Sequence, residues 1–315
     1  MNYKQVLAFI LTACVNVSQF AMANDDSLKQ EISQHIEQRS ELEYVTRDGS
    51  KLGYFARMAS EHPDTAFVYL HGIASHSGWF ELTANRLAAQ GHDVYMLDRR
   101  GSGVNRSQRS ITPGHIDSWH DWLDDLDDFI RQIRPQYNHI YLIGLSWGGK
   151  LATAYGLAHP DKVSGLALVT PGLVAAVDYN GFEKLSIAVC HLFCQQSTYP
   201  VPVTPAMFSD KQQWVEFIES DPLRNPLVTA EFLWQTRRMD KWIAANINQL
   251  QRPTLLFLAG KDEIIDNDKV TKLLFRGQQA TSVQHYPQQV HAIQLEMPNR
   301  LATDISQWLS QKEAQ

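Results

Sequence analysis

The feature that most constrains this chain is an apolar run that ends in a glycine-flanked serine and continues at once into a helical pattern. The run is Ile140–Ile143, and residues 144–148, Gly-Leu-Ser-Trp-Gly, follow it. Glycines on both sides of a serine let a strand and a helix approach closely around a strained turn, which lifts the hydroxyl above the sheet. The N-terminus of the following helix favours negative charge at the same place. The segment therefore predicts a nucleophilic Ser146, and a purely structural turn is the weaker interpretation.

Elsewhere, short apolar runs alternate with helical patterns, as in a three-layer α/β fold. The predicted strands are Leu42–Thr46, Leu52–Arg57, Ala66–Leu70, Val94–Leu97, Ile140–Ile143, Gly165–Val169, Thr254–Leu258 and Ser282–Tyr286. The predicted helices are Trp79–Gln90, Ile116–Arg134, Lys150–His159, Asp266–Arg276 and Pro298–Gln311. Asp48-Gly49 makes a hairpin of the first two strands. The later runs are apolar throughout, which indicates a mostly parallel central sheet of about eight strands buried on both faces.

The strand–helix alternation lapses from about residue 171 to about residue 251. An inserted helical cap before the last two strands is the economical interpretation, because long structureless loops are uncommon in compact domains. Its apolar side chains line a tunnel or form the cap's own core, and we expect at least half to do the latter. They are Phe182, Leu192, Phe193, Trp214, Phe217, Phe232, Trp234 and Trp242. Cys190 and Cys194 could form a disulfide, although two buried free thiols fit equally well.

A serine hydroxyl becomes a good nucleophile when a base takes its proton and a third group orients that base. Asp262 lies just beyond a predicted strand, and His291 follows the last one. The order serine, acid, base is the one expected on this kind of fold, so Asp262 is the predicted acid and His291 the predicted base. Of their competitors, Asp266 is typical of a helix N-cap, and His285 falls inside a strand pattern.

The reaction also needs hydrogen-bond donors for the oxyanion. A His-Gly turn follows the strand that ends at Leu70, and it predicts a backbone N–H donor at Ile73. The second donor is predicted to be the N–H of Trp147, directly after the nucleophile. We interpret His71 and His76 as hydrogen-bonding residues that shape this loop, because they lie on the oxyanion side.

Composition and motifs exclude several function classes. The 28 basic and 34 acidic residues give a net charge of −6 without a basic stripe, so no nucleic-acid partner is expected. The glycine-rich segment 97–103 lacks the dinucleotide and Walker patterns, and no zinc pattern is visible; we expect neither cofactor nor metal. An acidic run on a helical pattern is interpreted as a solvated face rather than a calcium site. Its residues are Asp117, Asp121, Asp124, Asp125, Asp127 and Asp128.

Residues 1–23 differ from the rest of the chain. Lys4 is their only charge, and Val6–Val17 is mostly apolar but shorter than the roughly 20 residues of a membrane span. The pattern predicts an export signal cleaved after Ala23, which would place the protein in the periplasm or outside the cell. The alternative is a lipoprotein anchored through Cys14, which ends a stretch that resembles a lipobox.

From about residue 40 to about residue 312, the chain resembles the α/β-hydrolase superfamily and, within it, the monoacylglycerol lipase and lysophospholipase group. The motifs that carry the resemblance are His71-Gly72 with His76-Ser77, residues 98–103, residues 144–148, residues 220–223, residues 260–262 and Tyr286–His291. The resemblance implies a triad of Ser146, Asp262 and His291 and a cap over an acyl pocket. The turn at Asp98-Arg99-Arg100 is more basic than the histidine-glycine version common in the lipases.

We therefore expect one catalytic domain, residues 24–315, that hydrolyses carboxylic esters of single-chain lipids through an acyl-enzyme. Its partner is a small lipid ester, with peripheral membrane contact through the cap. The alternatives are a general carboxylesterase and an aminopeptidase of the proline-iminopeptidase type, in which Glu216, Glu219 or Glu231 would hold the substrate ammonium. A non-catalytic binding module with a hydrolase shape is the alternative from another class. The sequence leaves the oligomeric state open.

Overall fold

The computed structural model describes residues 27–106, 112–276 and 281–313. The predicted export signal and Cys14 lie outside the described residues, so both interpretations of the N-terminus remain predictions. Within the described ranges, no helix is both long enough and apolar enough to cross a bilayer.

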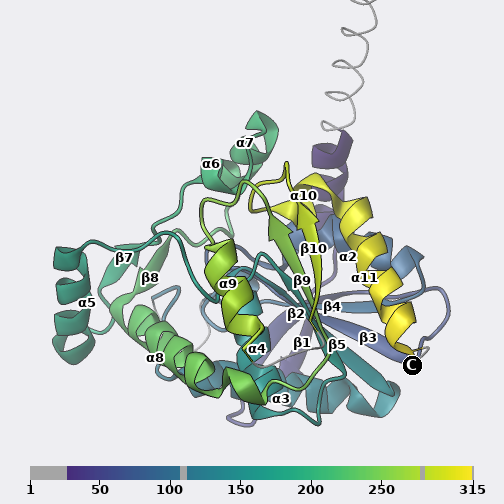
Figure 1. Cartoon of the computed structure of the whole chain (residues 1–315), viewed down its shortest axis with the longest axis horizontal. Coiled ribbons are helices and arrows are strands. Elements are labelled where there is room, and N and C mark those ends of the chain that lie inside the picture. The colour runs from purple at the N-terminus through teal and green to yellow at the C-terminus, as the bar shows by residue number, and fades with distance from the viewer. Residues whose placement is uncertain (1–26, 107–111, 277–280, 314–315) are drawn as a thin grey trace, which may run out of the picture.

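One sheet of eight strands forms the centre of the molecule, in the order β1-β2-β4-β3-β5-β6-β9-β10 (Figure 1). The strands are β1 (Leu42–Val45), β2 (Lys51–Arg57), β3 (Thr65–Leu70), β4 (Asp93–Leu97), β5 (His139–Leu145), β6 (Gly165–Val169), β9 (Thr254–Ala259) and β10 (Thr281–Tyr286). β2 runs antiparallel to β1 and to β4, and the other neighbouring pairs are parallel. The predicted mostly parallel sheet is confirmed.

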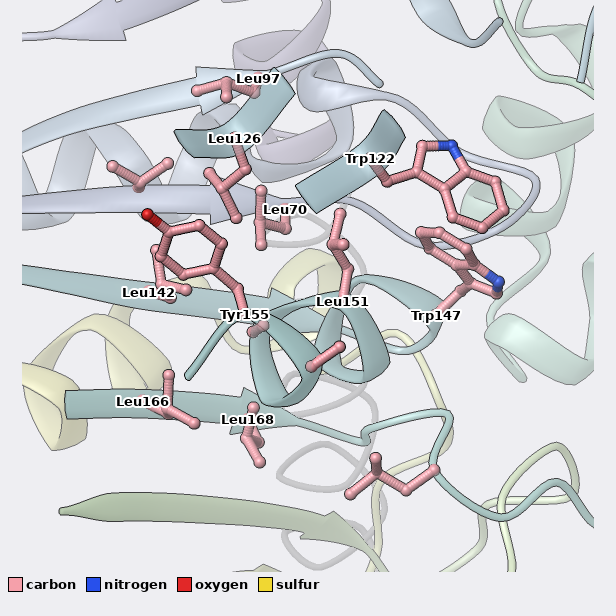
Figure 2. Packing of buried hydrophobic residues seen from close by; sticks show 14 of the residues in the cluster. Leu70, Leu97, Trp122, Leu126, Leu142, Trp147, Leu151, Tyr155, Leu166 and Leu168 are labelled. Atoms are coloured by element: carbon pink, nitrogen blue, oxygen red, sulfur yellow. The ribbon is translucent and has the colours of Figure 1, made fainter. Parts of the chain in front are cut away.

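Helices cover both faces of this sheet (Figure 1). One face carries α2 (Glu81–Ala89), α10 (Ile293–Glu296) and α11 (Pro298–Glu313), and the other carries α3 (Trp119–Ile133), α4 (Trp147–Ala158) and α9 (Asn267–Leu274). In β3, Phe67 and Tyr69 belong to the core beneath α2 and α11, whereas Val68 and Leu70 belong to the core beneath α3 and α4. Figure 2 shows the second core around α4. Because each face is covered, the central strands are apolar at every position.

Some elements differ from the predictions, at a capped helix start, at a 3₁₀ turn before a helix and at an edge strand of the sheet. α3 begins at Trp119, three residues after the predicted start, because the Ser118 hydroxyl accepts a hydrogen bond from the His120 N–H and caps the helix. The helix predicted from Trp79 divides into a 3₁₀ turn, η1 (Ser77–Phe80), and α2. β10 was expected to be apolar on both faces, and this is wrong, because β10 is an edge strand with an exposed Val283.

The segment between β6 and β9 contains the predicted helical cap. Its elements are α5 (Gly181–Phe193), β7 (Thr198–Pro200), α6 (Pro205–Phe208), α7 (Gln212–Ser220), β8 (Leu227–Thr229) and α8 (Ala230–Asn246). β7 and β8 pair in an antiparallel ladder that the sequence did not predict, since strands of three residues carry too little pattern. A helix at residues 27–38 was also not predicted.

The eight apolar side chains named for the cap differ in burial. Trp234 and Trp242 are partly buried, Trp242 packs against the hydrophobic core, and Leu192 is exposed. Trp214, Phe217 and Phe232 are buried in the hydrophobic core, as expected for cap packing. Phe182 and Phe193 on α5 are instead 81% and 82% exposed. The interpretation of these α5 side chains as tunnel or core residues is therefore wrong, because α5 turns that face to solvent.

The two cysteines at the end of α5 form a disulfide, Cys190–Cys194. Cys194 is exposed, and Cys190 is only partly buried. The interpretation as two buried free thiols is therefore wrong. A spacing of four residues brings both side chains to one side of a helical turn, so the helix end itself places the sulfur atoms together.

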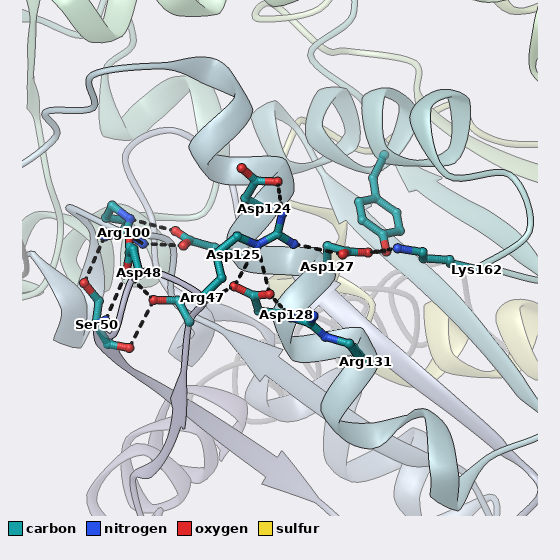
Figure 3. Close-up of polar contacts among 12 residues, drawn as sticks. Arg47, Asp48, Ser50, Arg100, Asp124, Asp125, Asp127, Asp128, Arg131 and Lys162 are labelled. Carbon is teal, nitrogen blue, oxygen red and sulfur yellow. Dashed lines mark hydrogen bonds and ion pairs between the residues drawn. The ribbon is translucent and has the colours of Figure 1, made fainter.

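Half of the acidic run is buried, so the interpretation as a solvated face is wrong for Asp125, Asp127 and Asp128 on α3 (Figure 3). Asp117, which precedes α3, is exposed. Arg47 donates hydrogen bonds to Asp127 at 2.9 Å and to Asp128 at 3.1 Å. The Nε of Arg100 donates to Asp125 at 2.8 Å. These cations come from the turn between β1 and β2 and from the turn after β4, so the pattern of α3 alone could not reveal them. Among the described residues, no group of His, Cys, Asp and Glu is arranged to hold a metal ion.

Candidate active site

The predicted site residues gather at one edge of the sheet. Ser146 follows β5, Asp262 follows β9 and His291 follows β10. The oxyanion loop, residues 71–76, follows β3. These four strands are parallel to one another, so their carboxyl ends meet at the edge where open α/β sheets bind ligands.

Ser146 occupies a strained turn between β5 and α4. Its φ is 51°, a left-handed conformation that non-glycine residues rarely adopt. A Cβ at Gly148 would lie 2.0 Å from the Leu70 carbonyl oxygen, and one at Gly144 would lie 2.6 Å from the Gly149 Cα. Only glycine fits at these two crossings, which explains the pattern that the sequence shows around the serine.

Asp262 and His291 are brought together by a hydrogen bond. The His291 Nδ1 lies 2.9 Å from the Asp262 Oδ2, and both side chains are fully buried. The backbone N–H groups of Ile264 and Ile265 donate to the Asp262 Oδ1 at 2.9 and 3.0 Å. A carboxylate only accepts hydrogen bonds, so in this contact Nδ1 is the donor and Nε2 is left to act as a base.

The segment after β6 contacts both Ser146 and His291. The Thr170 hydroxyl donates to the His291 carbonyl at 3.1 Å, and the Gly172 N–H donates to the Ser146 carbonyl at 2.6 Å. The His291 Nε2 is buried without a hydrogen-bond partner among the described residues. The hydrogen bond from Ser146 to Nε2 is therefore not formed in this structure, as is common in hydrolases before substrate binds.

The oxyanion loop lies directly against the nucleophile. A Cβ at Gly72 would lie 3.4 Å from the Ser146 Cβ. The N–H of Trp147 is the first of α4, so no carbonyl of its own helix is available to it. No hydrogen bond from the N–H of Ile73 or Trp147 to another described residue is found. The N–H of Trp147 directly follows Ser146, Gly72 lies against Ser146, and the assignment of Ile73 and Trp147 as the oxyanion donors stays a prediction.

The first four carbonyl groups of the oxyanion loop, in contrast, accept hydrogen bonds. Arg99 donates to the carbonyl oxygens of His71, Gly72 and Ile73, and the N–H of Asn225 donates to the next one, on residue 74. The sequence pattern predicts only a turn at Arg99 and does not identify these contacts. The basic turn after β4 was the available signal, but its contacts cross more than 20 positions of the chain.

His71 shapes the oxyanion loop, as predicted. Its Nδ1 donates to the Gly72 carbonyl at 2.8 Å, and its Nε2 accepts from the Arg99 N–H at 3.0 Å. Burial holds the pKa of His71 well below its usual value, and the Arg99 guanidinium lowers it further. Burial also lowers the pKa of Arg99 to about 9, while the Asp98 carboxylate opposes this shift. Neutral His71 and cationic Arg99 are consistent with these hydrogen bonds.

His76 connects the oxyanion loop to the cap. Its Nε2 lies 2.8 Å from Asp221, in the loop after α7, and the Trp79 Nε1 donates to the same carboxylate at 2.5 Å. This confirms that His76 is a hydrogen-bonding residue of the loop. Sequence reasoning did not foresee Asp221 as its partner, although Asp221 lies in a motif that carried the resemblance.

Three further residues bear on the site: Ser75 and the two alternatives considered for the acid and the base, Asp266 and His285. The Ser75 hydroxyl is buried without a partner among the described residues and would lie 3.2 Å from a Cβ at Gly72. Asp266 accepts from the Lys269 N–H and caps α9, which confirms its interpretation as an N-cap. His285 is an exposed residue of β10.

Comparisons with known proteins agree with this geometry. Human monoglyceride lipase is 23% identical over 261 residues, which cover 80% of this chain and 84% of that enzyme. Lysophospholipase L2 of Escherichia coli is 33% identical over 140 residues, 42% of this chain and 40% of that protein. The structure of a soluble variant of monoglyceride lipase from Saccharomyces cerevisiae matches with a TM-score of 0.75 at 18% identity, over 87% of this chain and 94% of that one, and shows the same fold.

The family model Hydrolase_4, described as serine aminopeptidase, S33, matches residues 61–298, more than half of the chain. Together with the sheet order and the serine turn, this match shows that the chain belongs to the Hydrolase_4 family of α/β-hydrolases.

Proposed function

We propose that this protein is a serine hydrolase that cleaves carboxylic esters of single-chain lipids, lysophospholipids or monoacylglycerols, through an acyl-enzyme. The observation that carries the proposal is the buried Asp262–His291 pair, whose Nε2 has no hydrogen-bond partner among the described residues. The segment after β6 donates hydrogen bonds to the backbone carbonyls of both His291 and Ser146. His291 takes the Ser146 proton as the hydroxyl attacks the ester carbonyl, and it then protonates the leaving alcohol. The N–H groups of Ile73 and Trp147 stabilise the oxyanion. Water activated by His291 releases the fatty acid in the second half of the reaction.

Two observations support a lipid substrate. Several relatives are named monoglyceride lipase, lysophospholipase or phospholipase. The cap helix α5 also exposes a continuous apolar face at helical spacing, formed by Phe182, Leu185, Val189, Leu192 and Phe193. We call these five residues the α5 face. Exposed apolar patches of this kind are typical of sites that contact protein or membrane.

We propose that the α5 face rests on the surface of a lipid aggregate and so brings substrate to the cap. The expected result of replacing both Phe182 and Phe193 with Ser is weaker co-sedimentation with phospholipid vesicles, without loss of activity on a water-soluble ester. Phe275→Ser is the matched control, because Phe275 is 48% exposed but lies on the chain after α9, away from the α5 face. Unchanged vesicle binding by the double variant would refute this contact.

An aminopeptidase would need a free carboxylate in the cap to hold the substrate ammonium. Glu231 is buried and bound to His191 and Gln235, and Glu216 pairs with Lys29 at 3.3 Å. Glu219, the third candidate carboxylate, lies on α7 with Glu216 and is exposed to solvent. The contacts of Glu231 and Glu216 disfavour an aminopeptidase that uses either of these two carboxylates.

The proposed activity is tested with a chain-length series of monoacylglycerols, lysophospholipids and short acetyl esters, with Ser146→Ala as the inactive control. We expect the long-chain lipids to react faster, because each buried CH₂ contributes about 0.8 kcal/mol. Faster turnover of acetyl esters would refute the lipid assignment, and faster cleavage of amides than of matched esters would indicate the aminopeptidase. Failure of a fluorophosphonate probe to label the folded protein would indicate a binding module.

We also propose that the protein is exported, with its signal cleaved after Ala23. The Cys190–Cys194 disulfide supports an oxidising compartment. The intact mass of the mature protein tests the proposal: a chain that begins at Asn24 is expected, and an acylated Cys14 would indicate the lipoprotein alternative instead.

A further inference from the structure

Arg99 directs its hydrogen bonds at one short piece of backbone. Its Nη1 lies 3.3 Å from the His71 carbonyl oxygen and 3.1 Å from that of Gly72, and its Nη2 lies 3.2 Å from that of Ile73. Nη2 also donates to the Ser102 hydroxyl at 3.1 Å. Arg99 is buried, and no ion pair of its guanidinium is found within the described ranges.

The neighbouring arginine behaves differently. Arg100 pairs with Asp125 on α3 and lies 3.4 Å from Asp48 in the β1–β2 turn, so its charge is neutralised by carboxylates. Both arginines are buried and belong to the same turn after β4. The Asp98 carboxylate stabilises the charge of Arg99, but the N–H groups of Arg99 are directed at peptide carbonyls and at the Ser102 hydroxyl rather than at a carboxylate. Its contacts with peptide carbonyls therefore call for a different explanation.

The explanation lies in the peptide group between Gly72 and Ile73. The carbonyl of this group accepts hydrogen bonds from the Arg99 Nη1 and the His71 Nδ1, and its N–H is the predicted oxyanion donor at Ile73. Two donors on one carbonyl fix the plane of the peptide group. A cationic donor at the oxygen also polarises the group, which makes the N–H at its other end a stronger donor.

Arg99 also reaches the second oxyanion donor. Its guanidinium carbon lies 4.3 Å from the centre of the Trp147 ring, the residue whose N–H begins α4. One buried cation therefore contacts the residues of both donors. Its field at the site favours the negative charge that develops on the oxyanion, and a low-dielectric environment strengthens this effect.

We propose that Arg99 is a positioning residue of the oxyanion hole, which orients and polarises the Gly72–Ile73 peptide and contacts the ring of Trp147. The inference rests on the proposed function, since it takes Ser146 as the nucleophile. Arg99 acts through backbone groups and does not itself touch the substrate. Its effect is therefore expected in the transition state and not in ground-state binding.

The test compares Arg99→Met, Arg99→Lys and Arg100→Met with the wild-type protein on a soluble p-nitrophenyl ester. For Arg99→Met we expect kcat to fall about 30- to 300-fold with KM changed less than about threefold, because loss of one oxyanion donor costs about 100- to 1000-fold. Affinity for a trifluoromethyl ketone, which forms an oxyanion with the serine, should fall in parallel. Affinity for a non-hydrolysable ether analogue should not change. Arg99→Lys keeps the charge and should recover part of the loss.

Arg100→Met is the matched control, because it removes a buried arginine from the same turn without touching the oxyanion loop. It should lower thermal stability but leave the ratio of ketone to ether affinity unchanged. A folded Arg99→Met protein with unchanged kcat and ketone affinity would overturn the inference. Equal losses of ketone and ether affinity, or no advantage of Arg99→Lys over Arg99→Met, would also overturn it, since they indicate a merely structural role.

The outcome is separable from that of the proposed function. A wild-type protein that cleaves the p-nitrophenyl ester but no lipid ester would contradict the proposed substrate, and the Arg99 effect would still support the inference. A folded wild-type protein that neither cleaves this ester nor reacts with the fluorophosphonate probe would overturn both.

Discussion

A single hydrogen bond decides which nitrogen of His291 is left as the base. Asp262→Asn keeps the shape of the partner but lets the imidazole adopt the wrong tautomer, so we expect kcat to fall about 10⁴-fold with little change in fold. Ester kinetics with circular dichroism as a folding check measure this. Asp266→Asn is the control, because Asp266 caps α9 and an asparagine is an equally good cap. Equal effects of the two substitutions would contradict the assignment of the acid.

His71 gives the protein a predictable dependence on pH. The pKa of His71 in the folded protein lies well below its value in the unfolded chain. As the pH falls below the unfolded pKa, the unfolded chain therefore binds a proton at His71 while the folded protein does not. This contribution to stability is complete above about pH 6.5 and is lost as the pH falls below it. Between pH 7.5 and pH 5, we expect the wild-type free energy of unfolding to fall by up to about 2 kcal/mol more than that of His71→Asn. Urea denaturation at both pH values measures the difference, and parallel pH dependences would contradict it.

Among single residues, the sequence predicted those whose catalytic role can be filled by only one or two types of amino acid. Ser146, Asp262 and His291 follow from the turn motif and from chain order, and the structure brings Asp262 to His291. Arg99 and Ser75 could not be predicted in the same way. Their surroundings depend on how the turns after β3 and β4 meet, and a local pattern does not contain that information.

At the scale of elements, the crossing of α4 over the end of β3 tolerates no side chain. Gly148→Ala would place a Cβ 2.0 Å from a backbone oxygen, so we expect it to cost at least about 3 kcal/mol of stability or to prevent folding. Gly181→Ala, at the start of α5, has open space around the new methyl group. It should leave stability unchanged or raise it by up to about 1 kcal/mol, because alanine favours the helix. Denaturation midpoints compare the two, and similar losses would refute the steric argument.

Which elements exist was easier to predict than what they face. Strand and helix positions followed from apolar periodicity, and Ser118 explains why α3 starts where it does. The outward orientation of the α5 face was not predictable, because an apolar stripe has the same periodicity whether it meets a core or a solvent-exposed surface. The disulfide between Cys190 and Cys194 was likewise not predictable with certainty, because it depends on where α5 ends.

At the scale of the whole molecule, the ion network on α3 joins the β1–β2 hairpin and the turn after β4 to the helical layer (Figure 3). Asp125→Asn leaves the buried Arg100 with only the more distant carboxylate of Asp48, at 3.4 Å, so we expect a loss of about 3 kcal/mol. Asp124→Asn is the control: its side chain is 45% exposed, and its contact with Arg47 should contribute less than about 1 kcal/mol. Urea unfolding curves separate the two, and equal losses would contradict the role of burial.

The acidic run shows why ion pairs between distant elements could not be predicted from the sequence. Carboxylates on an isolated amphipathic helix are expected in water, and only the assembled fold supplies the cations that bury Asp127 and Asp128. The mostly parallel sheet of about eight strands, in contrast, could be predicted, because short apolar runs alternate with helical patterns along the chain.

The positions of the cap and the C-terminus bear on how the protein can be handled. α11 ends on the opposite side of the molecule from α5 (Figure 1). The helix at residues 27–38 is instead paired with the cap, since Lys29 contacts Glu216 of α7. An affinity tag or a support attached after α11 would leave the α5 face open to vesicles. Attachment ahead of residue 27 would crowd the side of the molecule that the cap occupies, so immobilisation assays should use the C-terminal end.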